Sequence, residues 1–124
     1  MMQVDPSEDL TKFIFNRSQY SPSNDRVKYS AFMPPPNRRL SVFRIVGLAK
    51  NDLWEIGETI GKQRMLPLLA HADIKALSVA EAGLNIEADD IPPRHANIID
   101  WPEDHSAAIL KAKELARKAQ LHLK

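Results

Sequence analysis

The sequence LSVFRIV, residues 40–46, is the most strand-like stretch of the chain, and it decides how the rest is interpreted. β-branched and aromatic residues favour strands, and successive side chains of a strand point to opposite faces of a sheet. Leu40, Val42 and Arg44 are therefore expected on one face, with the alternate residues on the other. Gly47 follows directly, so we expect the strand to end there.

Other parts of the chain also predict extended segments or breaks. Five stretches are typical of extended chain, namely residues 12–15, 27–32, 68–73, 84–87 and 95–99. The segment 16–25 is rich in Ser, Asn and Pro and predicts a loop. Residues 34–36 are three prolines, which impose polyproline II geometry because proline fixes φ and has no N–H for a strand ladder.

The first of two main helices is predicted after the N-cap residue Asn51, where Leu53 and Ile60 lie at helical spacing. Gly57 and Gly61 each destabilise a helix by about 1 kcal/mol relative to alanine. Glycines four residues apart also let a neighbouring element approach closely. We favour this packing role for the pair.

The last helix is predicted to begin near Pro102, because proline suits the first helical turn. Its apolar stripe consists of Ile109, Leu110, Ala112, Leu115 and Ala119. Glu114 and Lys118 form a favourable pair four residues apart. A shorter helical turn, ended by Gly83, is predicted at residues 78–82.

The order of these elements, β–β–β–α–β–α–β–β–α, predicts an α+β protein. We expect a small mixed β-sheet with two main helices packed on it, both on one face. No internal repeat or boundary divides the chain, so residues 1–124 are expected to form a single domain. Its core is expected within residues 12–120, with residues 1–11 as a flexible segment.

Composition excludes several classes of protein. The 124 residues include no cysteine, which rules out disulfide scaffolds, thiolate zinc sites, iron–sulfur clusters and cysteine nucleophiles. Apolar residues make up 44% of the chain, which is enough for a core. No apolar run is long enough for a transmembrane helix, and residues 1–10 are acidic, unlike a signal peptide. A cytoplasmic location is expected.

The formal net charge of +1 conceals a strong segregation of charge. Residues 1–10 and 51–110 carry net charges of −3 and −7, whereas residues 11–50 and 111–124 carry +7 and +4. Such blocks can form a basic binding surface or can neutralise one another within one fold. We favour neutralisation, and leave open whether opposed surface patches remain.

The stretch RHANIIDWP, residues 94–102, is the first candidate site. On a strand, His95 and Asn97 share one face, where they could contact a phosphate, a base or a ribose, or act as acid–base and orienting groups. A simpler interpretation, which we favour for so short a pattern, is that the two side chains satisfy backbone groups at a strand end.

His71 and Asp73 are the second candidate, because they also share one face of a predicted strand. Together with His95 they could ligate zinc or iron. No metal-binding motif supports that reading, so an ordinary ion pair is favoured and no metal or other cofactor is expected.

Arginines and tryptophans complete the candidates. Arg38, Arg39 and Arg44 could form bidentate contacts with a phosphate or carboxylate, and Trp54 and Trp101 could anchor a partner. Core packing is the favoured role for both tryptophans. The main contact candidates are thus Arg38, Arg39, Arg44, His95, Asn97 and Trp101, with His71, Asp73, Arg94 and Trp54 as secondary ones.

Several blocks resemble a group of small, stand-alone bacterial proteins: AFMPPP (31–36), LSVFR (40–44), GL (83–84), HANI (95–98) and WP (101–102). The resemblance covers about residues 12–118 and implies a bacterial protein but no particular activity. Asp100, where that group would have glycine, is a departure that leaves the local turn undefined.

A second, fainter similarity is to NAD-using ADP-ribosyl transferases and the related RNA 2′-phosphotransferases. In those enzymes a Gly-Leu turn followed by Arg and His helps to hold the substrate, and here 83–84 precede 94–95. The similarity implies that Arg44 and His95 converge in a pocket. The chain is shorter than those enzymes and shows neither their Ser or Tyr stacking motif nor their catalytic Glu.

The leading expectation is a binding or accessory protein that engages a protein partner or a polyanionic ligand through its Arg-rich and His-Asn surface. Nucleic acid or a nucleotide is less favoured, since no P-loop or GxGxxG motif is present, and no membrane contact is expected. One alternative is the transferase just described. The other is an antitoxin-like inhibitor or assembly subunit, with an exposed apolar patch at Trp54 or Trp101.

Overall fold

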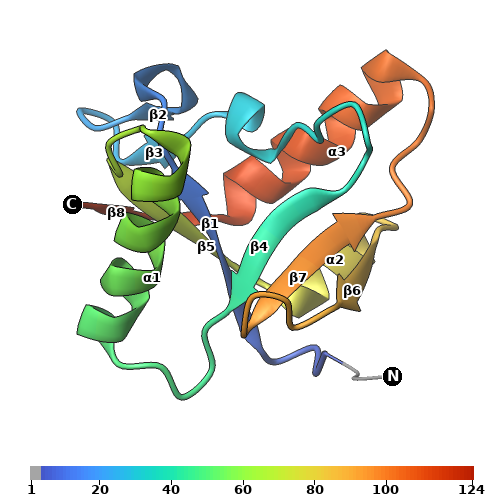
Figure 1. The fold of residues 1–124 in the computed structure, drawn as a ribbon. Helices are drawn as coiled ribbons and strands as arrows, with labels where there is room; N and C mark the ends of the chain where they lie inside the picture. The colour runs from blue at the N-terminus through green and yellow to red at the C-terminus, as the bar shows by residue number, and fades with distance from the viewer. Residues whose placement is uncertain (1–3) are drawn as a thin grey trace.

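A computed structural model describes residues 4–124, in which six strands form one sheet (Figure 1). In chain order the strands are β1 (Asp9–Ile14), β4 (Leu40–Arg44), β5 (Ala70–Lys75), β6 (Asn85–Ala88), β7 (His95–Ile99) and β8 (Gln120–Leu123). Their spatial order is β6-β7-β4-β1-β5-β8, and all five pairings are antiparallel. A separate ribbon pairs β2 (Tyr20–Ser21) with β3 (Arg26–Val27).

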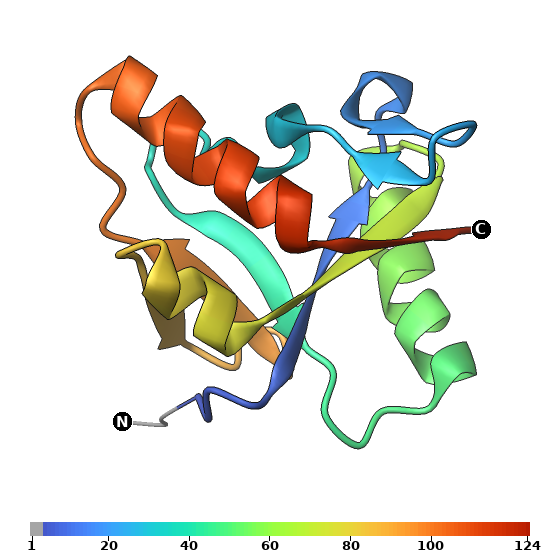
Figure 2. The same ribbon diagram turned by 180° about the vertical axis from the view of Figure 1, so that it is seen from behind.

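Helices cover both faces of the sheet. Helix α1 (Lys50–Arg64) lies on one face, whereas α2 (Ala76–Glu81) and α3 (His105–Lys118) lie on the other (Figures 1 and 2). Two short 3-10 helices, η1 (Arg17–Gln19) and η2 (Tyr29–Phe32), flank the ribbon. Within residues 4–124, no helix has the length and apolar character needed to cross a membrane.

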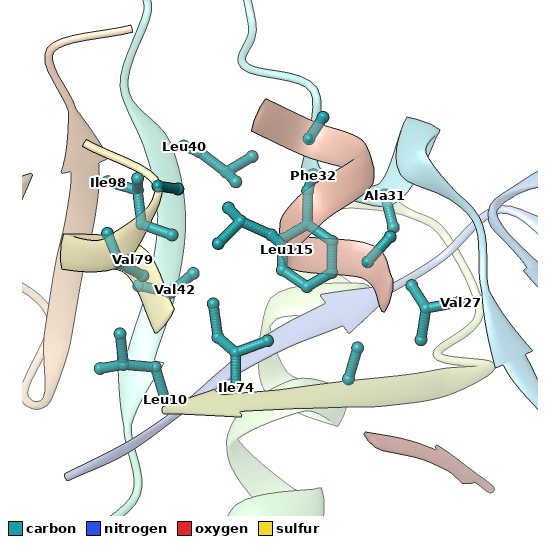
Figure 3. Packing of buried hydrophobic residues seen from close by; sticks show 14 of the residues in the cluster. Leu10, Val27, Ala31, Phe32, Leu40, Val42, Ile74, Val79, Ile98 and Leu115 are labelled. Carbon is teal, nitrogen blue, oxygen red and sulfur yellow. The ribbon is translucent and has the colours of Figure 1, made fainter. Parts of the chain in front are cut away.

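The larger core lies between the sheet and the face covered by α2, α3 and η2 (Figure 3). Phe32 and Leu115 enter it from the helical side and Leu10, Val42 and Ile98 from the sheet, all with at most 1% of their surface exposed. Burying a side chain of this size contributes about 1.5–3 kcal/mol. This layer therefore supplies most of the hydrophobic stabilisation.

A smaller core lies beneath α1 on the opposite face. It joins Phe13 and Phe43, whose ring centroids are 5.5 Å apart, to Leu53 of α1 and to Leu68. Gly57 of α1 lies directly over Phe13, so that a Cβ atom there would fall 2.7 Å from the phenyl ring. The packing role expected for this glycine is therefore confirmed.

The α+β class is confirmed, with two corrections to the arrangement. The sheet is antiparallel throughout rather than mixed. The helices lie on both faces rather than on one, because β1 is apolar on both sides: Leu10 and Ile14 face the larger core, and Phe13 faces α1. A strand with two apolar faces requires a covering layer on each.

Several element bounds also differ from expectation. Strand β1 begins at Asp9, and the fully buried Leu10 places the start of the core before residue 12. Residues 1–3 of the predicted flexible segment lie outside the described residues. The stretch 27–32 is mostly a 3-10 helix, and β8 lies in a stretch for which no strand was predicted.

The helix starts were also misplaced. Helix α1 begins at Lys50, one residue before the predicted cap. Helix α3 begins at His105 rather than near Pro102, because the Asp104 carboxylate accepts a hydrogen bond from the Ala107 N–H at 2.9 Å and caps the helix there.

Replacing Gly61 with alanine tests the close packing of α1. A Cβ atom at this position would lie 2.7 Å from the backbone carbonyl oxygen of Leu66. Overpacking of this kind costs about 1–3 kcal/mol, more than the roughly 1 kcal/mol gained in helix propensity. We expect Gly61→Ala to lower the urea midpoint of unfolding and the exposed control Thr59→Ala to leave it nearly unchanged. A stabilised Gly61→Ala variant would contradict the packing described.

Candidate functional site

The strands β4, β7 and β6 carry a row of polar side chains on the face opposite α2 and α3. In the register of the sheet, Ser41 lies opposite Asn97, which in turn lies opposite Glu87, and Phe43 lies opposite His95. Helix α1 lies over β1 and β5 and leaves this part of the face without a covering helix (Figures 1 and 2). Of the residues in the row, Glu87 is exposed and Ser41 partly exposed, whereas Asn97 is 4% exposed.

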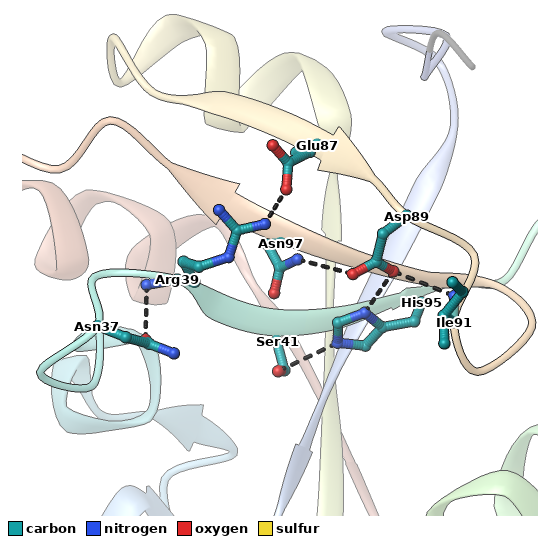
Figure 4. A network of polar contacts seen from close by, with 8 residues as sticks. All are labelled: Asn37, Arg39, Ser41, Glu87, Asp89, Ile91, His95 and Asn97. Atoms are coloured by element: carbon teal, nitrogen blue, oxygen red, sulfur yellow. Dashed lines mark hydrogen bonds and ion pairs between the residues drawn. The ribbon is translucent and has the colours of Figure 1, made fainter. Parts of the chain in front are cut away.

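A hydrogen-bonded relay connects three of these positions with the loop after β6 (Figure 4). The Nδ1 atom of His95 lies 2.7 Å from Oδ1 of Asp89, and its Nε2 atom lies 3.1 Å from Oγ of Ser41. The second carboxylate oxygen of Asp89 accepts from the Asn97 amide at 3.2 Å. Ser41, His95 and Asp89 thus form a continuous chain of contacts.

The carboxylate determines the protonation pattern of this relay. Burial acts to raise the pKa of Asp89, but hydrogen bonds from His95, Asn97 and the Ile91 N–H, with the charge of His95, lower it below its usual value. An ionised carboxylate only accepts hydrogen bonds, so Nδ1 of His95 carries a proton. In the neutral imidazole, Nε2 then accepts a hydrogen bond from the Ser41 hydroxyl.

Three of the six main candidates lie together on this face. His95 and Asn97 belong to the relay, and the Arg39 guanidinium donates a hydrogen bond to Glu87 beside it (Figure 4). The sequence favoured an interpretation in which His95 and Asn97 satisfy backbone groups. That interpretation is wrong, because both side chains hydrogen-bond to other side chains.

The other three main candidates are held elsewhere. Arg38 donates to the carbonyl of Trp101 and pairs with Glu103. Arg44 forms a bidentate pair with Glu8, whose side chain is 5% exposed, on the face opposite His95. Trp101 is 2% exposed and its indole N–H donates to the Ile98 carbonyl at 3.0 Å.

The secondary candidates also contact other parts of the protein. Arg94 donates to the carbonyl oxygens of Arg44 and Val46, which ties the end of β4 to the start of β7. Trp54 of α1 is half-buried, and its ring meets the edge of His71 at a centroid distance of 4.6 Å.

A second polar cluster lies on the same face of the sheet, where α1 covers it. His71 and Asp73 share that face as expected, with Nδ1 of His71 2.8 Å from Oδ1 of Asp73. The Thr11 hydroxyl donates to Asp73 at 2.6 Å, and His122 contacts its other oxygen at 3.2 Å. Two strands, β1 and β4, lie between β5, which carries His71 and Asp73, and β7, which carries His95. Within residues 4–124, no group of potential ligands has metal-binding geometry.

A third site is a basic pocket where β3, η2 and the second half of α3 meet. The cavity has a volume of about 650 Å³ and is lined by Ser18, Arg26, Val27, Lys28, Tyr29, Ser30, Lys113, Ala116 and Arg117. Val27 and Ala116 are buried and apolar, whereas the four cationic side chains belong to exposed residues. The ammonium group of Lys113 lies 5.6 Å from the centre of the Tyr29 ring.

The charges around this basic pocket are not balanced by neighbours. None of the ion pairs found in residues 4–124 includes Arg26, Lys28, Lys113 or Arg117. Two of these cations come from the basic block 11–50 and two from the basic block 111–124. The sequence analysis favoured neutralisation of the basic blocks by the acidic ones. Within the described residues, the four cations of this pocket are not neutralised in this way.

Comparisons with protein-family models, with curated proteins and with solved structures find no match to this chain. The two resemblances drawn from sequence stay predictions. The transferase similarity implies that Arg44 and His95 converge, and the two side chains lie on opposite faces of the sheet.

Sequence reasoning missed Ser41, Asp89 and the cations of the basic pocket. The alternation of β4 places Ser41 and Phe43 on one face, which was a usable signal. Asp89 lies in an acidic loop that resembles ordinary solvated surface, and only the fold brings it to His95. The two basic blocks were recognised in the sequence, but their charge was expected to be neutralised within the fold.

Asp73→Asn tests the cluster beneath α1. Burial acts to raise the pKa of Asp73, but hydrogen bonds from His71 and Thr11 and the charges of His71 and His122 lower it below its ordinary value. A carboxyl with a lowered folded-state pKa stabilises the fold above its unfolded pKa of about 3.9, and this stabilisation is lost as pH falls through the folded pKa. We expect a loss of about 1–2 kcal/mol at neutral pH that shrinks in acid, measured by urea unfolding.

The matched control for this prediction is Asp9→Asn. Asp9 pairs with Lys75 at 2.8 Å, but both side chains are about half exposed, and exposed pairs contribute about 1 kcal/mol or less. An equal loss in both variants would show that the cluster around Asp73 is no stronger than a surface pair.

Proposed function

We propose that this protein binds a small polyanionic ligand in the basic pocket formed by β3, η2 and α3. The observation that carries the proposal is the convergence of four cations without ion-pair partners in residues 4–124 around one cavity, namely Arg26, Lys28, Lys113 and Arg117. Uncompensated cations lining a concave surface attract and hold anions.

The shape and lining of the basic pocket favour a small molecule over an extended polymer. Its volume of about 650 Å³ lies in the usual range for small-molecule sites, about 300–1,000 Å³. The lining includes the buried apolar side chains of Val27 and Ala116, the aromatic ring of Tyr29, and the hydroxyl groups of Ser18 and Ser30. A phosphorylated compound with a flat or apolar body matches this combination.

The alternative functions have less support in the geometry. A transferase of the kind described requires Arg44 and His95 on the same side of the sheet, and they are on opposite sides. An inhibitor or assembly subunit was expected to expose Trp54 or Trp101; Trp101 is buried and Trp54 is half-buried against His71. The leading expectation was a protein partner or a polyanionic ligand bound through the Arg-rich and His-Asn surface. We retain the polyanionic ligand and propose the basic pocket as its site; a protein partner stays a prediction.

Titration calorimetry with inorganic tripolyphosphate tests the proposal. We expect measurable binding at low ionic strength that weakens as salt is added, because exposed charges are screened. The double variant Lys113→Gln/Arg117→Gln should weaken binding at least about tenfold, which corresponds to about 1.4 kcal/mol.

The matched control is Lys50→Gln/Lys62→Gln, which removes the same net charge from exposed positions on α1. A general effect of net charge would weaken binding equally in both double variants. That result, or a wild-type protein that does not bind tripolyphosphate at low salt, would contradict the proposed site.

A further inference from the structure

The geometry points to a second, independent activity: Ser41 is a nucleophile activated by His95 and Asp89, and it accepts an acyl group from a carboxylic ester. The site lies on the face of the sheet opposite α3 (Figures 1 and 4), and none of its residues lines the basic pocket. It therefore goes beyond the proposed binding function and is tested apart from it.

The order of contacts is the one that nucleophilic catalysis by serine requires. A serine hydroxyl is a weak nucleophile until an adjacent base accepts its proton, and a third group must hold that base in the correct tautomer. Here Asp89 contacts Nδ1 of His95 at 2.7 Å, which leaves Nε2 free to accept from Ser41 at 3.1 Å. Both distances lie in the range for proton transfer.

The imidazole of His95 is held firmly by its surroundings. Its side chain is 13% exposed, and its ring meets the ring of Phe43 edge to face at a centroid distance of 5.4 Å. Asp89 is itself fixed by the Asn97 amide and by the Ile91 N–H at 3.2 Å. Fixed orientation of the base reduces the reorganisation needed when the proton moves.

Donors for a developing negative charge lie on the same face. Asn97 is directly opposite Ser41 across the β4–β7 pair, and its amide has a second hydrogen beyond the one donated to Asp89. Arg39 lies two residues before Ser41 and on the same face of the sheet. Its guanidinium pairs with Glu87, and the two side chains are 42% and 44% exposed. We assign the electrostatic stabilisation of the oxyanion to these two groups.

The reaction balances with water as the only co-reactant. Oγ of Ser41 attacks the ester carbonyl, its proton passes to Nε2 of His95, and an Oγ–C bond forms. Collapse of the tetrahedral oxyanion breaks the C–O bond to the alcohol, which leaves with the proton held by His95. Water then attacks the acyl-serine by the same route, and the carboxylic acid and free Ser41 are released.

Labelling with a fluorescent fluorophosphonate tests the nucleophile directly. The probe forms an Oγ–P bond to an activated serine and expels fluoride. We expect one adduct on Ser41 of the folded wild-type protein, located by peptide mass spectrometry, and none after unfolding in urea. An unlabelled Ser41 in the folded protein overturns the proposal without any variant being needed.

Variants separate activation from mere exposure. Asp89→Asn should slow labelling by roughly 10²-fold or more, since loss of the orienting carboxylate favours the wrong imidazole tautomer. His95→Ala should abolish labelling, and the exposed control Ser106→Ala on α3 should label at the wild-type rate. Variants are compared only after circular dichroism confirms the native fold.

Ester hydrolysis gives a second readout. We expect p-nitrophenyl butyrate to be hydrolysed by the wild-type and Ser106→Ala proteins, and hydrolysis to fall to the uncatalysed rate in Ser41→Ala. Equal labelling or equal hydrolysis in a folded His95→Ala variant would show that the relay does not activate Ser41, and the proposal would be wrong. Tripolyphosphate binding is unaffected by either outcome, so the two proposals fail independently.

Discussion

The structure depends on one strand that is buried on both of its faces. β1 pairs with β4 on one side and β5 on the other, and its alternating side chains enter two separate cores. Leu10 and Ile14 pack toward α2 and α3, and Phe13 packs beneath α1. Because successive strand residues point to opposite faces, a shift of one residue in register would exchange these two sets. The pairing of β1 therefore fixes which side chains of every neighbouring strand face which helix.

The same alternation places polar residues in two different environments on one face. Beneath α1, the cluster of Thr11, His71 and Asp73 is shielded, and His71 is only 2% exposed. Beyond α1, the relay of Ser41, His95 and Asp89 has no helix above it (Figures 1 and 4). Burial makes the first cluster a contribution to stability. The second lies beyond α1, and the Asp89 side chain is 34% exposed. The length and position of one helix thus separate a structural cluster from a candidate reactive one.

Local features of the sequence predicted part of the local structure. The strand at 95–99 has the predicted bounds, and the shared faces of His71 with Asp73 and of His95 with Asn97 follow from strand alternation alone. The partners of these strands could not be predicted in the same way, because strand pairing is set by long-range packing. Asp89 reaches His95 through the β6–β7 turn, and Ser41 does so through the β4–β7 pairing. The contacts between Ser41, His95 and Asp89 could therefore not be predicted from the sequence.

The protein has a net charge of only +1, yet it carries a local concentration of positive charge. The reason is that some basic side chains form ion pairs in the fold and others do not. Arg44 is neutralised by Glu8 and Arg39 by Glu87, so each joins the basic block 11–50 to an acidic block. Arg26 and Lys28 belong to the same basic block, but they lie on and beside the ribbon strand β3, where residues 4–124 offer them no carboxylate partner. α3 then brings two further cations to the same cavity. Positive charge without ion-pair partners in the described residues therefore remains where the basic blocks 11–50 and 111–124 meet. An anion binds most favourably at such a concentration of positive charge.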